Sequence, residues 1–85
     1  MTYVAGYKFK PTHFDIHYVR GEFNPNGSYH ENFTRNQDEA HRFSNWFLAK
    51  ETIDKIVDQF EPDPEYTWTP VVQEISDGLT SYRRL

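Results

Sequence analysis

Apolar and polar side chains alternate in two segments near the start of the chain. In residues 2–10, one face of an extended chain carries Tyr3, Ala5, Tyr7 and Phe9, and the other carries Val4, Gly6, Lys8 and Lys10. In residues 14–23, the alternation sets Phe14, Ile16 and Tyr18 against Asp15, His17 and Val19. A period of two is typical of strands with one buried face, and Pro11 between the segments favours a turn. We therefore predict two strands that pair as an antiparallel hairpin.

A strong turn signal separates this hairpin from a third predicted strand. The sequence from Asn24 to Gly27 ends in Asn-Gly, which tolerates the positive φ of a tight reversal. Residues 28–34 then alternate, with Tyr29, Glu31 and Phe33 against His30, Asn32 and Thr34. Both faces are polar enough to predict an edge strand. Residues 35–43 predict either a short helical turn near residues 38–41 or the approach to the main helix.

Apolar side chains at three- and four-residue spacing predict the main helix, over residues 45–59. The apolar row consists of Trp46, Ala49, Ile53, Ile56, Val57 and Phe60. The opposite face is charged and consists of Lys50, Glu51, Asp54, Lys55 and Asp58. This division is typical of an amphipathic helix that covers one side of a core. Ser44 or Asn45 can cap the free amide groups of its first turn.

Pro62 and Pro64 require the helix to end near Phe60, because proline cannot continue a helix. After a short acidic connection, residues 67–75 alternate again and predict a last strand, in which Pro70 favours an edge position or a bulge. The tail, residues 79–85, is expected to fray unless it docks. Together these elements predict a single α+β domain over residues 1–85. The order along the chain is strand, strand, strand, helix, strand, with one amphipathic helix packed on one face of a small antiparallel sheet.

The sequence contains more aromatic rings than one helix and one small sheet can cover. There are seven Phe, six Tyr and two Trp, and the rings expected outside the core are Tyr3 or Tyr7, Tyr29, Tyr66, Trp68 and Tyr82. Exposed Tyr and Trp are enriched at the energetic centres of protein interfaces. We select Tyr66 and Trp68 as partner-binding candidates. In the alternative interpretation, the rings pack loosely at the rim of a small core.

The net charge of −4 arises in the second half of the chain. Residues 44–77 contain eight acidic side chains and two basic ones, Lys50 and Lys55. The acidic candidates for partner binding are Glu51, Asp54, Asp58, Glu61, Asp63 and Glu65. Regularly spaced carboxylates can imitate a phosphate backbone and occupy the basic groove of a nucleic-acid enzyme. In the alternative interpretation, they form an ordinary solvated helix face, on which Glu51 and Lys55 make an i to i+4 ion pair.

The sequence lacks the residues that several classes of function require. The chain has no cysteine, which excludes disulfides, thiolate zinc sites and cysteine nucleophiles. The dispersed glycines form no phosphate loop, and the basic residues are too scattered to bind nucleic acid directly. No segment has the apolar length of a signal peptide or a membrane span, which favours a cytoplasmic protein. We expect no enzyme activity and no cofactor.

His13, Asp15 and His17 invite a metal hypothesis, because alternate residues of a strand share a face. Two imidazoles and a carboxylate can hold zinc or iron. Residues four apart on a strand are separated by about 13 Å, however, which is too far for both histidines to reach one ion. We therefore interpret the three side chains as a solvated strand face and expect no metal site. His30 and His41 have no pattern of serine or carboxylate around them and are interpreted as surface histidines.

One segment resembles a pattern that recurs in small phage-encoded accessory proteins. It reads Gln37-Asp38-Glu39-Ala40-His41-Arg42-Phe43-Ser44 and is followed by Ala49 and Ile53. In those proteins the segment is similar to a short strand that leads into a helix packed on a sheet. Trp46 and Phe47 depart from the pattern, which usually has charged residues there. The resemblance implies a small viral protein that modulates a host factor, often a defence or nucleic-acid-processing enzyme.

We therefore expect a non-enzymatic protein-binding module. From the resemblance, it would be a phage-type modulator or inhibitor of a host protein in the host cytoplasm. The alternative is a small homo-oligomeric or virion-associated structural protein. A small chain buries a modest core, so support from a partner or from self-association is expected in either case.

Overall fold

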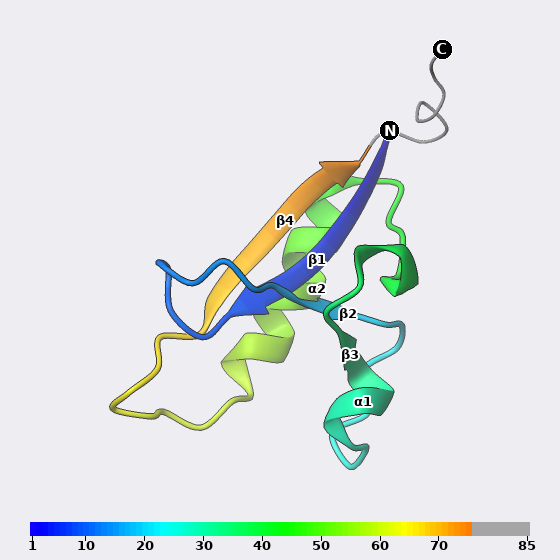
Figure 1. Cartoon of the computed structure of the whole chain (residues 1–85). Helices are drawn as coiled ribbons and strands as arrows, with labels where there is room; N and C mark the ends of the chain where they lie inside the picture. The colour runs from blue at the N-terminus through cyan, green and yellow to red at the C-terminus, as the bar shows by residue number, and fades with distance from the viewer. Residues whose placement is uncertain (76–85) are drawn as a thin grey trace.

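The computed structural model describes residues 1–75, which form a four-stranded antiparallel sheet with one long helix against it (Figure 1). The elements are β1 (Thr2–Lys8), β2 (His17–Val19), α1 (Tyr29–Asn32), β3 (Phe33–Thr34), η1 (Gln37–Glu39), α2 (Trp46–Asp58) and β4 (Thr69–Ile75). Across the sheet, the strands lie in the order β3-β2-β1-β4. The predicted α+β class is confirmed. The predictions for residues 79–85 and for Tyr82 fall outside the described residues.

β1 lies inside the sheet and pairs along its whole length with β4. The register runs from Thr2 opposite Ile75 to Lys8 opposite Thr69, so the first and last described strands lie side by side (Figure 1). β4 is an edge strand, and an edge strand accommodates Pro70 because one side of its backbone needs no ladder partner. The predicted edge position of the last strand is confirmed, although the strand begins at Thr69 rather than at residue 67.

β2 confirms the predicted hairpin with β1 but is much shorter than residues 14–23. If the register of the pair continued, Gly21 would lie opposite Tyr3. Phe43 occupies that position instead: its N–H donates to the Tyr3 C=O at 2.8 Å, and its C=O accepts from the Tyr3 N–H at 2.9 Å. At the other end of the predicted strand, Phe14 is 97% exposed and outside the sheet. The strand is therefore limited by a distant segment, which local alternation cannot show.

The segment predicted as a third strand, residues 28–34, begins with a helical turn instead. Ser28 and Glu31 form a capping box, in which the Glu31 N–H donates to Ser28 Oγ at 3.3 Å and the Ser28 N–H donates to Glu31 Oε1 at 2.8 Å. This reciprocal pair satisfies amide groups at a helix start and outweighs a weak polar alternation. Phe33–Thr34 alone pair with β2, at the edge of the sheet. The predicted edge position is thus confirmed, and the predicted strand start is wrong.

α2 confirms the main helix to within one residue at each end. Asn45 caps it, with Oδ1 accepting from the N–H groups of Phe47 at 2.7 Å and Leu48 at 3.3 Å. The core under the helix consists of Ala49, Ile53 and Ile56 packed against Ala5, Tyr7, Val19 and Phe33, with Val57 and Phe60 partly buried beside them. Trp46, which the sequence assigned to this apolar row, is 42% exposed. It is the first residue of the helix and precedes the first buried position, Ala49, by almost a full turn.

The other face of the sheet is covered by the connection between β3 and α2. Val4 and Tyr18 pack there against Ala40, which follows η1. The short helical turn predicted near residues 38–41 is present one residue earlier. The connection is held by the His41 N–H, which donates to the Val19 C=O at 2.8 Å. The middle of β1 is therefore buried on both faces, whereas the alternation predicted one buried face.

Candidate protein-binding site

The first turn of α2 exposes three consecutive apolar side chains. Trp46 is 42% exposed, Phe47 is 74% exposed and Leu48 is 50% exposed, and these three residues are termed the helix-start patch. Consecutive residues of an α-helix are rotated by about 100° from one another, so three in a row cannot all face the core. Ala49 takes the buried position of this turn. Contiguous exposed apolar side chains of this kind mark interaction surfaces more often than isolated ones do.

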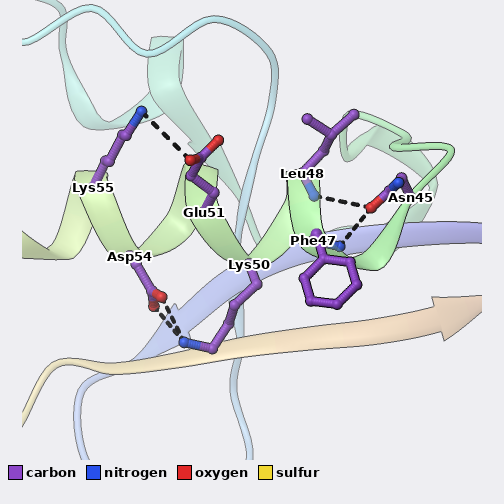
Figure 2. A pocket seen from close by; sticks show the side chains of 7 residues that line it. All are labelled: Asn45, Phe47, Leu48, Lys50, Glu51, Asp54 and Lys55. Carbon is purple, nitrogen blue, oxygen red and sulfur yellow. Dashed lines mark hydrogen bonds and ion pairs between the residues drawn. The ribbon is translucent and has the colours of Figure 1, made fainter.

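Phe47 and Leu48 border a shallow depression on the outer face of α2 (Figure 2). It has a volume of about 420 Å³ and is lined by Asn45, Phe47, Leu48, Lys50, Glu51, Asp54 and Lys55. Figure 2 shows the side-chain oxygen of Asn45 bonded to the backbone N–H groups of Phe47 and Leu48, which holds the first turn in place. A backbone that is already fixed loses little conformational freedom when its side chains bind a partner.

The charged residues of this outer face are paired with one another along the helix (Figure 2). Lys50 Nζ lies 2.6 Å from Asp54 Oδ2, and Lys55 Nζ lies 4.0 Å from Glu51 Oε2, which confirms the predicted Glu51–Lys55 pair. Exposed pairs of this kind contribute at most about 1 kcal/mol to stability. Two of the three helix carboxylates selected as partner-binding candidates are thus offset by lysines, and the third, Asp58, is exposed near the helix end. The face alternates in charge rather than presenting a continuous acidic row.

The other acidic candidates, Glu61, Asp63 and Glu65, lie in the loop after α2, and all three are exposed. Asp63 closes this loop, because its Oδ1 accepts from the Glu65 N–H at 2.8 Å and its C=O accepts from the Tyr66 N–H at 3.2 Å. A helix of 13 residues is about 20 Å long, so the loop and the helix-start patch lie at opposite ends of α2. The structure therefore divides the predicted acidic set into two separate groups.

Tyr66 and Trp68, the aromatic candidates, are half-buried at the rim of an aromatic cluster. Their rings stack with centroids 5.3 Å apart, and Trp68 meets Phe9 and Phe60 edge to face, each at 5.5 Å. The Trp68 Nε1–H donates to the Glu61 C=O at 3.1 Å, which ties the acidic loop to the start of β4. The two rings thus have a structural role in addition to any exposed area that they offer a partner.

The remaining rings predicted to be exposed divide into buried and exposed ones. Tyr3 is half-buried and Tyr7 is only 5% exposed, so the prediction for this pair is wrong: both lie on the face of β1 that α2 covers. Burial, and to a lesser extent Tyr29, raises the pKa of Tyr7 to about 12. Tyr29 is 37% exposed, as predicted, and its hydroxyl makes a hydrogen bond with His17 Nδ1. Burial, followed by the charge of Arg35, lowers the pKa of His17.

The residues considered as metal ligands do not gather around one point. Asp15 Oδ2 accepts a hydrogen bond from Arg35 Nη2 at 2.9 Å, and His17 is engaged with Tyr29. In the part of the chain that the structure describes, no three His, Asp or Glu side chains lie close enough together to hold a metal ion. Geometry therefore gives the set of His13, Asp15 and His17 no support as a ligand set.

Sequence reasoning did not select Phe47 and Leu48, the most exposed residues of the helix-start patch. The available signal is the unbroken apolar run from Trp46 to Ala49, which is wider than the single face that an amphipathic helix buries. Assigning Trp46 to the apolar row left the next two residues unexplained. An apolar run that covers all sides of a helix turn must expose some of its members.

None of the helices in residues 1–75 is long and apolar enough to cross a membrane. Comparison of the chain with protein-family models, curated proteins and solved structures found no match. The resemblance of residues 37–44 to phage accessory proteins therefore stays a prediction.

Proposed function

We propose that the protein is a non-enzymatic protein-binding module whose partner docks on the outer face of α2. The observation that carries this proposal is the helix-start patch, where Phe47 is 74% exposed on a helix turn that Asn45 holds in place. Phe47 and Leu48 are the apolar anchors, and the paired charges beside them form a polar rim. Interfaces commonly combine an apolar centre with such a rim.

Apolar contact is the larger source of affinity on this face. Fully burying a Leu or Phe side chain is worth about 1.5–3 kcal/mol, whereas an exposed ion pair is worth at most about 1 kcal/mol. Glu51, Asp54 and Asp58 then act mainly on association rate and on the choice of partner. In this assignment the carboxylates remain part of the interface, at its polar rim.

The partner implied by the resemblance is a host protein, such as a defence or nucleic-acid-processing enzyme, and the module would act on it as a modulator or inhibitor. The support for this finer proposal is the segment Gln37–Ser44. A nucleic-acid-processing enzyme has a basic groove. The carboxylates of the loop after α2, which make no ion pair in the described part of the chain, are suited to such a groove. The docking face and the kind of partner are therefore separate parts of the proposal, and they are tested separately.

Self-association through the same patch is a second candidate, as in a homo-oligomeric or virion-associated structural protein. The alternation of Lys50, Glu51, Asp54 and Lys55 favours it, because a face that carries both charges can be complementary to itself across a twofold axis. Sedimentation velocity separates the two candidates. A homo-oligomer would sediment as such alone and dissociate when Phe47 and Leu48 are replaced by Ala, whereas a binding module is a monomer until its partner is added.

The test of the proposed function compares proteins captured from a bacterial host extract by wild-type protein and by the double variant Phe47→Ala/Leu48→Ala. The double variant should recover at least about tenfold less of the specific partner than the wild-type protein does, because both anchors are lost. Phe14→Ala is the matched control, since Phe14 is 97% exposed and lies away from α2. Equal recovery by the double variant, or an equal loss with Phe14→Ala, would contradict the proposal.

A further inference from the structure

A second depression lies at the other end of α2 and is lined mainly by aromatic rings. It has a volume of about 420 Å³ and is lined by Tyr7, Phe9, Phe60, Glu61, Pro62, Asp63 and Trp68. β1, the loop that follows α2 and the segment that enters β4 all contribute to this aromatic pocket. A helix length of about 20 Å separates it from the helix-start patch, so the two surfaces are independent.

The rings of the aromatic pocket meet at steep angles. The plane of Trp68 makes an angle of 83° with Tyr7, 82° with Phe9 and 79° with Phe60. The faces of aromatic rings carry partial negative charge. A pocket lined by four rings is therefore apolar and can also accept a flat organic cation against a ring face.

Two carboxylates lie beside these rings, and neither makes an ion pair within residues 1–75. Glu61 and Asp63 line the pocket, and no lysine or arginine is among its lining residues. Within residues 1–75, the four ion pairs involve other carboxylates, which lie in the segment before β2, in η1 and in α2. Asp63 Oδ1 accepts from the Glu65 N–H at 2.8 Å, which fixes the carboxylate next to the pocket. Both the rings and the carboxylates thus favour positive charge.

We propose that the aromatic pocket binds the guanidinium group of an arginine side chain from a protein partner. A guanidinium is planar, stacks on aromatic faces and donates two parallel hydrogen bonds to a carboxylate, so it can use the rings and Asp63 or Glu61 together. A lysine ammonium is more strongly hydrated and offers no flat face. A neutral apolar side chain would fill the space but would not neutralise either carboxylate.

This inference deepens the proposed function and rests on it for the source of the arginine, which is the docked protein. Binding of the guanidinium itself is a property of the pocket and can be measured without a partner. Failure of the helix-start patch to bind a protein and failure of the pocket to bind arginine are therefore separate results.

The test is an NMR titration of the full chain with N-acetylarginine amide, monitored at the indole N–H of Trp68. The chain has two tryptophans, and Trp46→Phe identifies which resonance belongs to Trp68. N-acetylcitrulline amide is the control ligand, because it has nearly the same shape and no charge. We expect a saturable shift with N-acetylarginine amide. The dissociation constants of N-acetylcitrulline amide and N-acetyllysine amide should be at least about fivefold higher. No saturable shift, or equal binding of citrulline or lysine, would overturn the proposal.

A pair of variants separates the pocket from general surface charge. Glu61→Gln/Asp63→Asn removes both charges while an amide oxygen can still accept from the Glu65 N–H, and it should strongly reduce the preference for arginine over citrulline. Glu65→Gln removes a charge from the same loop at a residue that does not line the pocket, and it should preserve that preference. An equal loss in both variants would show that loop charge alone attracts the ligand and would refute the site.

Discussion

Gly6 lies in β1 where a side chain would collide with the backbone that leads into β2. A Cβ atom placed there would lie 2.6 Å from the His17 carbonyl oxygen and 2.8 Å from Ile16 Cγ2. Real Cβ atoms do not approach backbone oxygen so closely, so a side chain at this position must push the strands apart. The absence of a side chain is therefore what permits the pairing of Gly6 with Tyr18.

Gly6→Ala should destabilise the protein by about 1–3 kcal/mol, because relief of the clash requires shifts in a close-packed sheet. Gly21→Ala is the matched control, since nothing lies within 4 Å of a Cβ at Gly21, and its effect should stay within about 0.5 kcal/mol. Urea denaturation measures both. Similar midpoints for the two variants would show that β2 does not lie against Gly6 as described.

His17 makes the stability of the protein depend on pH. Its ring stacks on Phe9 with centroids 4.6 Å apart, and burial lowers its pKa below the value of 6.5 expected in the unfolded chain. The folded state therefore binds this proton more weakly than the unfolded state does. The resulting contribution to stability is fully present above the unfolded pKa and is lost as pH falls from there toward the folded pKa.

His17→Asn should flatten the dependence of the unfolding free energy on pH between about pH 7 and pH 5, because the variant has no imidazole to protonate. The measurement is urea unfolding of both proteins at several pH values in that range. Parallel profiles would mean that His17 is as easily protonated in the fold as in the unfolded chain. Asp15 and Arg35 lie close enough to influence the ring, with opposite effects on its pKa, and both remain in the variant.

Among the elements, those with a long regular period could be predicted from the sequence. The spacing of Ala49, Ile53 and Ile56 identified α2, and the turn ending at Gly27 is present, with the Gly27 N–H donating to the Asn24 C=O at 2.9 Å. The bounds of the short elements depend on interactions other than a periodic pattern. β2 ends because Phe43 takes its place beside β1, and the capping box at Ser28 turns a weakly alternating segment into α1.

The two faces of α2 should respond very differently to truncation. Ile56→Ala removes a side chain that is 3% exposed and should cost about 2–5 kcal/mol, a large part of the stability of so small a domain. Leu48→Ala removes an exposed side chain from the same helix and should change stability by about 0.5 kcal/mol or less. Thermal or urea denaturation tests both. A loss with Leu48→Ala as large as that with Ile56→Ala would place Leu48 in the core and remove it from the docking face.

For the whole molecule, α2 both covers the core and separates two exposed surfaces. The charged candidates on it could be selected from the sequence, because regular charge on one helix face is visible there. The helix-start patch was missed because Trp46 was assigned to the buried row. The aromatic pocket combines Tyr7, Phe60 and Trp68 from three distant segments. No local pattern shows that convergence, since it depends on β4 pairing with β1.

For the whole molecule, the proposed docking site of a partner is the outer face of α2. The most direct measurement is a backbone amide NMR spectrum of the isotope-labelled protein with and without its captured partner. We predict shifts or broadening concentrated in residues 45–55, around Phe47 and Leu48, with or without changes at the aromatic pocket. Unchanged amides throughout residues 45–55, with the changes confined to α1, β3 or other parts of the protein, would contradict docking on α2.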